Sequence, residues 1–194
     1  MLTMLLSIAA VSAQERLEMS ESDGFEWIRV TDSEGHIGAL DEDDSVLVPT
    51  RYCRVVYSRG MLVADSCAED YLVGTAVFTS DGECIIPASR EYLKVKPTHQ
   101  KGADFLLVRI KMDRRTYWGV CDIYGNEVIS PVMYADLMAD PHSMFYYTEK
   151  GFAVKRDKKR DKFTYIGIFV DEDGRMYQED SDGIRTYLVE EEEE

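Results

Sequence analysis

The sequence is poor in the residues that most often carry chemistry. It has only three histidines, His36, His99 and His142, and none lies at a motif spacing from a carboxylate or a cysteine. It also has no Gly-x-Ser-x-Gly elbow, no His-Glu-x-x-His pair, no phosphate-binding glycine loop and no dinucleotide fingerprint. We therefore predict no catalytic residue and no cofactor. Because distances in the fold are invisible in a sequence, only a triad assembled in space escapes this search.

Positive charge is also scarce. The 194 residues include 22 Lys and Arg against 37 Asp and Glu, a formal net charge of −15. Such a surface repels phosphate backbones and anionic lipid headgroups, so we expect neither nucleic-acid binding nor docking on an anionic membrane. The acidic run at 190–194 is predicted to be a disordered tail. Arg156 to Lys162 is the one basic island; it is predicted to be an exposed hairpin tip, with a docking site for an acidic partner as the alternative.

Cysteine is too sparse and too irregularly spaced for a disulfide-rich scaffold. There is no Cys-x-x-Cys or mixed Cys and His pattern, so no zinc site is predicted. In an exported protein the four cysteines allow up to two disulfides in three connectivities, and the sequence does not choose among them. Two of them lie in apolar runs and are predicted to be small core residues. The four are Cys53, Cys67, Cys84 and Cys121, and the predicted core pair is Cys84 and Cys121.

No segment is long and apolar enough to span a bilayer. Residues 1–13 are uncharged and mostly apolar, but they are too short for a transmembrane helix. Val11-Ser12-Ala13 fits a signal-peptidase site, so we predict a signal peptide at 1–13, a mature N-terminus at Gln14 and a short linker over 14–23. No Lys or Arg precedes the apolar run, which leaves a buried N-terminal strand or helix as the alternative. The protein is expected to be exported, to the periplasm, to the outer membrane or to the medium.

What the sequence does contain is repetition. Four segments open with a glycine and an apolar run, at Gly24, Gly60, Gly102 and Gly151, with spacings of 36, 42 and 49 residues. Each segment continues with a polar stretch, a second apolar run and an acidic or glycine turn. In three of the four a third apolar run then ends near a proline. Periods of this size are typical of repeat architectures.

The apolar runs have the length and composition of β-strands. They are four to eight residues long, rich in Val, Ile, Phe and Tyr, and bounded by turn-forming residues. Asp-Gly at 81–82 and 173–174 and Gly125-Asn126 supply the positive φ of tight turns. The proline after each third run, at Pro49, Pro87 or Pro131, is expected to end strand pairing.

The predicted fold is therefore all-β, a tandem array of three-stranded antiparallel meanders. The units are placed at about 24–59, 60–101, 102–150 and 151–189. Neighbouring units are expected to stack into one continuous core, either as an open solenoid or as a closed propeller. Helix is limited to one or two turns at 88–94 and 132–140.

One glycine recurs inside the units. Gly119 has counterparts at Gly38 and Gly167, and Gly74 lies only loosely in register. A repeated glycine in a strand indicates close approach of another backbone or a ring. We expect Tyr117 and Trp118, its neighbours in the chain, to cover it.

Clustered carboxylates and aromatic residues are the remaining candidates for binding. Carboxylates beside a turn glycine can hold calcium, but no acidic turn here has a distal Glu at the expected place, so solvated turns and no metal are predicted. The aromatic residues are predicted to be mostly core, with an exposed strip for glycan or peptide as the alternative. The acidic residues are Asp41, Asp43, Asp44, Asp171, Asp173, Asp180 and Asp182; the aromatic ones are Trp27, Tyr117, Trp118, Phe145, Tyr146, Tyr147 and Tyr165.

The segment YWGVCDIYGNEVISPVMY, residues 117–134, resembles the WG-repeat motif of Trp-Gly-Val-Ile-Asp, a glycine turn, Val-Ile-Pro-Pro and Tyr. The matching positions are Trp118, Gly119, Val120, Asp122, Gly125, Val128, Ile129 and Pro131. A weaker copy matches at Ile37, Gly38, Asp41, Val48, Pro49 and Tyr52, and the resemblance covers most of 24–178.

This resemblance implies an interaction scaffold of the bacterial envelope that has no general enzymatic activity. The expected partner is another envelope or secreted protein. A glycan is the alternative, and a hydrolase or an inhibitor is less favoured. The sequence does not identify the binding residues.

Overall fold

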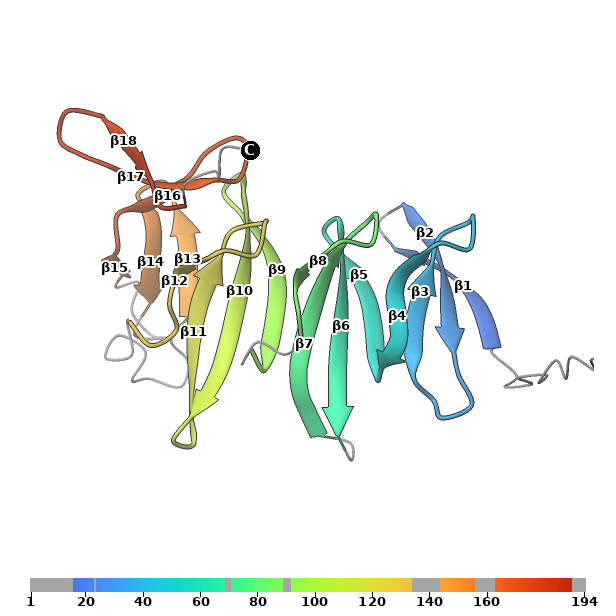
Figure 1. Cartoon of the computed structure of the whole chain (residues 1–194). Coiled ribbons are helices and arrows are strands. Elements are labelled where there is room, and N and C mark those ends of the chain that lie inside the picture. Colours follow the sequence, from blue (N-terminus) through green and yellow to red (C-terminus); the bar gives the residue numbers. More distant parts are fainter. Residues whose placement is uncertain are drawn as a thin grey trace, which may run out of the picture.

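The computed structural model of the protein describes residues 16–22, 24–68, 71–88, 92–133, 144–155 and 163–189, and among these it contains strands but no helix (Figure 1). The all-β prediction is confirmed. Several predicted features lie outside the described residues: the signal peptide, the basic island, His142, the acidic tail and most of the two expected helical turns.

Eighteen strands form five antiparallel sheets in the described residues. Three sheets have four strands: β1 (Arg16–Ser22), β2 (Phe25–Thr31), β3 (Ile37–Leu40) and β4 (Val46–Tyr52); β5 (Arg54–Ser58), β6 (Met61–Ala68), β7 (Tyr71–Thr79) and β8 (Cys84–Ile86); and β9 (Lys94–Gln100), β10 (Ala103–Met112), β11 (Arg115–Cys121) and β12 (Glu127–Ile129). Two have three strands: β13 (Met144–Thr148), β14 (Gly151–Lys155) and β15 (Phe163–Tyr165); and β16 (Ile168–Val170), β17 (Met176–Glu179) and β18 (Arg185–Tyr187).

The meanders are longer than the sequence predicted. The strand that precedes each opening glycine pairs with the strand that follows it, so β1, β5, β9 and β13 belong to the same sheets as β2, β6, β10 and β14. Gly24, Gly60 and Gly102 lie in the turns of these hairpins and Gly151 is the first residue of β14, all with φ between +77° and +82°. Three-stranded units are therefore wrong for the first three meanders, which have four strands, and most of the predicted 14–23 linker is strand β1.

The fourth meander is divided. Its third strand is interrupted at Gly167, where φ is +76° and the backbone leaves the extended region. Before the interruption β15 pairs with β14, and after it β16 pairs with β17. The predicted unit 151–189 therefore contributes to two sheets rather than one.

Alternation along the strands explains why the central runs are continuously apolar. Adjacent residues of a strand point to opposite faces. In β10, Leu106 and Val108 pack in a cluster with Val77 of β7, whereas Phe105 and Leu107 pack in a cluster with residues of β13 and β14. Both faces of this sheet are thus buried between neighbours, and Figure 1 shows the first four sheets side by side in a row.

Prolines behave as predicted at two of three places. Pro87 and Pro131 follow the last residues of β8 and β12. Pro49 instead lies inside β4, whose pairing with β3 continues to Tyr52 through a register shift. An edge strand tolerates proline because one side of it needs no ladder hydrogen bond, and β4 is the edge of its sheet.

The recurring glycine marks a close approach of another backbone, one of the two kinds that the sequence predicted. A Cβ on Gly119 would lie 2.5 Å from the carbonyl oxygen of Ile129 and 2.6 Å from Cδ of Pro131. The nearest atoms belong to Ile129 and Pro131, at and just beyond the end of the neighbouring strand β12. Gly38 and Gly74 have the same environment, with a carbonyl oxygen 2.8 Å and 2.5 Å away, while nothing lies within 4 Å of such a Cβ on Gly167.

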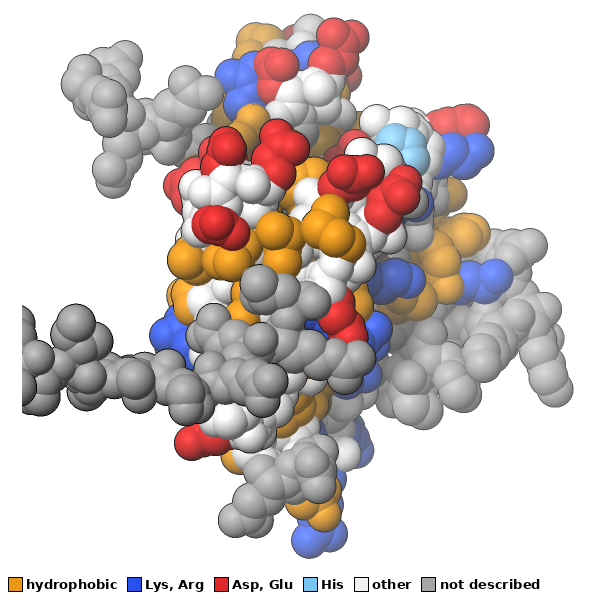
Figure 2. Space-filling model, turned by 90° about the vertical axis from the view of Figure 1, so that its right-hand side faces the viewer, with side chains coloured by type: hydrophobic (Ala, Val, Ile, Leu, Met, Phe, Trp, Pro, Cys, Tyr) orange, Lys and Arg blue, Asp and Glu red, His pale blue; other side chains and the backbone are white. Residues whose placement is uncertain are grey.

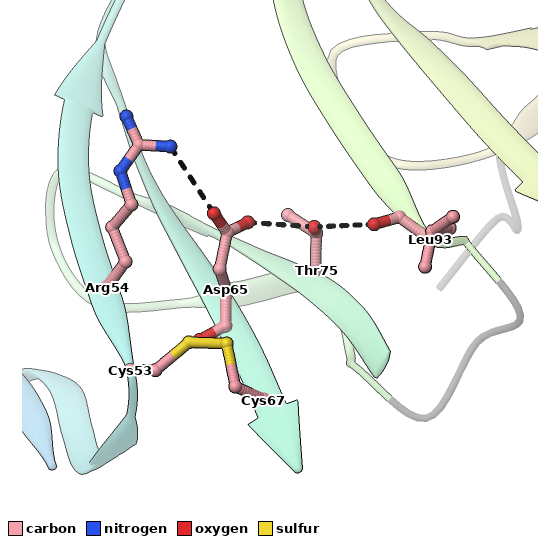
Figure 3. The surroundings of a disulfide bond; sticks show 6 residues. All are labelled: Cys53, Arg54, Asp65, Cys67, Thr75 and Leu93. Atoms are coloured by element: carbon pink, nitrogen blue, oxygen red, sulfur yellow. Dashed lines mark hydrogen bonds and ion pairs between the residues drawn. A yellow bond between two sulfur atoms is a disulfide. The ribbon is translucent and has the colours of Figure 1, made fainter. Parts of the chain in front are cut away.

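A disulfide and a polar chain tie the second sheet together and connect it to the segment that leads into the third (Figure 3). Cys53, between β4 and β5, is bonded to Cys67 of β6. Asp65 of β6 accepts a hydrogen bond of 2.9 Å from the buried hydroxyl of Thr75, which also lies 3.3 Å from the Leu93 carbonyl oxygen.

Cys84 and Cys121 form no disulfide, and the core prediction is confirmed for only one of them. Cys121 is buried, as expected of a core residue, and its Sγ lies 3.6 Å from the Tyr92 hydroxyl. Cys84 is exposed, so its placement in the core was wrong. It lies in β8, an edge strand of three residues in which only Ile86 is buried.

Candidate binding surfaces

The carboxylates that begin the acidic turns accept hydrogen bonds from backbone amides of the same turns. In each turn the Oδ1 atom of the first aspartate accepts hydrogen bonds from the amides two and four residues later, at 2.7 to 3.0 Å. The first amide of the turn donates to the fifth carbonyl, and the fourth amide donates back to the first carbonyl. The aspartates are Asp32, Asp41, Asp122, Asp171 and Asp180; Thr79 holds the same position in the 79–83 turn.

These bonds give the carboxylates a structural role. Burial opposes ionisation of Asp171, but the Arg175 amide and guanidinium and the Tyr187 hydroxyl bind its charged form and together hold its pKa below the ordinary value. Within the described residues no group of three His, Cys, Asp or Glu side chains is arranged to hold a metal ion. This turn geometry was not predicted from the sequence, although in four of the five turns the first aspartate is followed three residues later by glycine, which is a signal for it.

His99 lies in a cleft that has some of the residue types of an enzyme site. A cleft of about 610 Å³ is lined by Ser58, Arg59, His99 and Asp104, from the turn regions of the β5–β6 and β9–β10 hairpins. His99 Nδ1 lies 2.9 Å from Asp104 Oδ1, directly across the hairpin. Both side chains are about half exposed, at 43% and 56%, and no hydrogen bond joins Ser58 to His99. The arrangement therefore lacks the shielded proton relay that activates a serine.

A second cleft, of about 540 Å³, lies between the fifth sheet, the β9–β10 turn and Tyr147. The two arginines that line this cleft already contact side chains of the protein itself. The Arg175 guanidinium lies 4.8 Å from the Tyr187 ring centre and bonds Asp171, while that of Arg185 lies 4.5 Å from the Tyr177 ring centre. These stacked pairs cover the ring faces that a sugar would need, so the cleft is a weak candidate for ligand binding.

The outer face of the first sheet is the strongest candidate. Register and alternation place Met19, Ile28, Leu40 and Val46 on the side of this sheet that faces away from the second sheet. Met19 is 69% exposed and Val46 is 60% exposed, and Ile28 and Leu40 are partly exposed. Figure 2 shows this face with apolar side chains across its middle. We call these four residues the head face.

Carboxylates border the head face on one side. Glu21 and Glu26 stand directly opposite each other on it, and both are exposed. The 41–45 turn adds more carboxylates beyond Leu40 and Val46, and acidic side chains lie above the apolar ones in Figure 2. Like charges directly opposite each other in a sheet are destabilising. A basic partner at this edge would relieve that repulsion.

The opposite end of the row has a different face. Tyr146, Ala153 and Tyr165 are aligned across β13, β14 and β15, on the side opposite to Phe152, which packs toward the third sheet. Phe163 contacts the rings of Tyr146 and Tyr165 at centroid distances of 6.1 and 6.3 Å. Tyr165 is 48% exposed. We call Tyr146, Phe163 and Tyr165, with the two lysines described next, the tail face.

The tail face carries positive charge. Lys150 Nζ lies 5.6 Å from the centre of the Tyr165 ring, and Lys155 Nζ lies 5.9 Å from that of Phe163. Cation–π contacts of this kind hold the ammonium groups over the rings. The tail face is therefore aromatic and basic, whereas the head face at the other end of the row is apolar and bordered by acidic residues.

The prediction that the aromatic residues are mostly core is confirmed for three of them. Trp27, Tyr117 and Phe145 are buried, whereas Trp118, Tyr146 and Tyr147 are partly exposed and Tyr165 is exposed. The exposed strip that the sequence offered as an alternative thus corresponds to the tail face. The head face was missed, because each of its apolar residues also fits a buried strand.

Comparison of the chain with models of known families, with curated proteins and with solved structures gave no match. The resemblance to WG repeats therefore remains a prediction. Among the described residues no helix has the length and apolar character that a membrane span requires.

Proposed function

We propose that the protein is a non-enzymatic binding and scaffold module of the bacterial cell envelope, which engages another protein through its stacked β-sheets. The observation that carries this proposal is the head face. It is an apolar sheet surface of at least four side chains, partly or largely exposed and bordered by carboxylates. Exposed apolar surface rimmed by polar residues is typical of protein interaction sites.

The proposed architecture is an open array in which each sheet covers its neighbour. Apolar clusters join the first sheet to the second, the second to the third, and the third to the fourth. A unit at the end of an array has no neighbour on one side, so its outer face needs either polar residues or a partner. The head face has apolar residues, which supports a partner.

Location at the envelope rests on two features. Residues 1–13 have the composition of a signal peptide. The Cys53–Cys67 disulfide belongs with oxidising compartments such as the bacterial periplasm, since cytosolic thiols are kept reduced. The bacterial origin itself follows only from the resemblance to WG repeats.

A capture experiment with envelope extract of the host tests the proposal. Val46→Lys places a charge in the head face and, because Val46 is exposed, should change stability by less than about 0.5 kcal/mol. Val73→Lys is the matched control, since Val73 is 55% exposed on β7, away from the head face. We expect Val46→Lys to lose a captured protein that wild type and Val73→Lys retain. Identical capture by all three would refute the head face as the interaction site.

A glycan-binding accessory protein is the second candidate, favoured by the tail face alone. Rings on adjacent strands, partly exposed, provide a platform on which sugar rings can stack. Calorimetry should then show that the Tyr165→Ala variant no longer binds envelope polysaccharide and that the Tyr71→Ala variant still binds it. Tyr71 is 77% exposed and lies on β7, away from the tail face.

A further inference from the structure

We infer that the head face of one copy binds the tail face of another, so that the protein assembles head to tail. This inference rests on the proposed function, because it names the occupant of the proposed interaction site. Figure 1 shows sheet β1–β4 at one end of the row of sheets and sheet β13–β15 at the other, so the two faces belong to sheets at opposite ends. One copy can therefore use both faces at once without steric conflict between its two neighbours.

The two faces are complementary in charge. The head face is bordered by Glu21, Glu26 and the carboxylates of the 41–45 turn. The tail face presents Lys150 and Lys155 over its rings. Contact would bring ammonium groups to carboxylates that otherwise repel each other, whereas two head faces would repel. Charge therefore favours head-to-tail contact over a symmetric contact between two heads.

The two faces also resemble the junctions inside one copy. Where the third and fourth sheets meet, Phe105 and Phe152 lie edge to face with ring centres 4.9 Å apart. Where the first and second sheets meet, Phe25 and Tyr57 stack at 4.4 Å. Aromatic rings thus fill the space between sheets. The head face has no ring of its own and the tail face has three, so joining them would give a junction of the internal kind.

The area is small enough to make the contact reversible. A face of three or four strands and five to seven residues covers about 240–440 Å² per partner, from a strand spacing of ~4.8 Å and a rise of ~3.3 Å per residue. The total of roughly 480–880 Å² is below the ~1,200 Å² of standard interfaces. We therefore expect a dissociation constant on the order of 100 µM. The net charge of −15 per copy opposes association, so physiological ionic strength is needed to screen distant repulsion.

Contact between two different faces has a consequence that a symmetric contact lacks. Each copy keeps one unused head and one unused tail, so association continues past the dimer unless the rotation closes a ring. A copy with a damaged head retains a working tail, and a copy with a damaged tail retains a working head. Each damaged copy alone associates much more weakly than wild type, and a mixture of the two forms dimers and stops there.

Sedimentation velocity of the exported, disulfide-bonded protein tests this, over about 10 µM to 1 mM at physiological ionic strength. Wild type should increase in mass with concentration beyond a dimer. Val46→Lys and Tyr165→Glu should each weaken association at least about tenfold. Their equimolar mixture should form dimers only. Val73→Lys and Tyr71→Glu, at exposed positions outside both faces, should behave as wild type.

The outcomes separate this inference from the proposed function. A wild type that stays monomeric at 1 mM, the upper limit of the assay, overturns head-to-tail assembly. So does a Tyr165→Glu variant that associates as wild type does, because the contact would then not use the tail. If either result occurs while Val46→Lys still loses its captured host protein, the head face binds a different protein and only the self-assembly is wrong. If Val46→Lys changes neither association nor capture, the proposed function fails as well.

Discussion

Replacing Gly119 by alanine tests how the sheets are built, because two effects of opposite sign compete at this residue. Removing a glycine from a strand normally stabilises a protein by about 0.5–1 kcal/mol, since the unfolded chain loses conformational freedom. The added Cβ, however, would lie 2.5 Å from the Ile129 carbonyl oxygen and 2.6 and 2.7 Å from ring carbons of Pro131. Those distances are about 1 Å shorter than the optimal separation of non-bonded atoms.

Neither neighbour can move cheaply. The Ile129 carbonyl belongs to the backbone of β12, and Ile129 itself is fully buried. Overpacking of a dense core costs typically 1–3 kcal/mol. The net expectation for Gly119→Ala is therefore a destabilisation of about 1–2 kcal/mol, and more for Gly119→Val. With a urea slope of about 2 kcal/mol/M this lowers the unfolding midpoint by roughly 0.5–1 M.

Two other glycines are the controls. Gly38→Ala should cost about as much as Gly119→Ala, because the Thr50 hydroxyl can rotate away but the Val48 carbonyl oxygen at 2.8 Å and the Thr50 Cα at 2.9 Å belong to the backbone. Gly167→Ala meets nothing within 4 Å and should cost only the roughly 1 kcal/mol of a left-handed backbone. Urea midpoints followed by circular dichroism, with the disulfide intact, decide the ranking. An unchanged midpoint in Gly119→Ala would show that the close approach does not constrain the fold.

Four further predictions follow from other parts of the chain. Reducing the Cys53–Cys67 disulfide, or replacing both cysteines by alanine, should lower the free energy of unfolding by about 3 kcal/mol for a closed loop of this length. The urea midpoint should fall accordingly, while Cys84→Ser should leave it unchanged. Millimolar calcium should raise the melting temperature by less than about 5 °C, because the turn carboxylates already bind backbone amides; a larger rise in calorimetry would contradict this. Asp171→Asn should lower the unfolding midpoint at pH 7, and the midpoints of variant and wild type should converge in acid. The pKa of Asp171 in the folded protein lies below the ordinary 3.8, so its charge stabilises the fold above pH 3.8. This stabilisation disappears as the pH falls through the folded-state pKa. Intact mass of the protein from its host should begin at Gln14, and recovery of a full-length cytoplasmic form would contradict export.

Much of the fold could be predicted from local pattern. Runs of β-branched and aromatic residues between turn formers located most strands, and the glycines of the 81–82, 125–126 and 173–174 turns do adopt positive φ. The missed strands have weaker patterns. Arg16–Ser22 is polar enough to resemble a linker, and it is a strand because its backbone pairs along its whole length with β2. Pairing of this kind is not visible in the composition of one segment.

The candidate surfaces could not be predicted, because they depend on which sheet lies at the end of the row. The alternation of Trp27 and Ile28 is the same whether one face or both are covered. Similarly, Tyr146 and Tyr147 are adjacent in one apolar run, and only the register with β14 places one on the tail face and the other toward Phe105. Position in the array, rather than residue type, distinguishes a surface residue from a core residue here.

The head face has the composition of an internal face, and this is the main argument for its function. A terminal sheet that had only to face water would carry polar residues at alternate positions. The first sheet instead carries Ile28, Leu40 and Val46 on its outer side, with Trp27, Ala39 and Val48 on its inner side. Apolar side chains on both faces are the pattern of β10, which is covered on both sides. Exposing such a face forfeits about 25 cal/mol for every Å² left in water, and it invites aggregation unless a defined partner covers it. The carboxylates at its border select the partner, because they repel another head face and attract a basic surface.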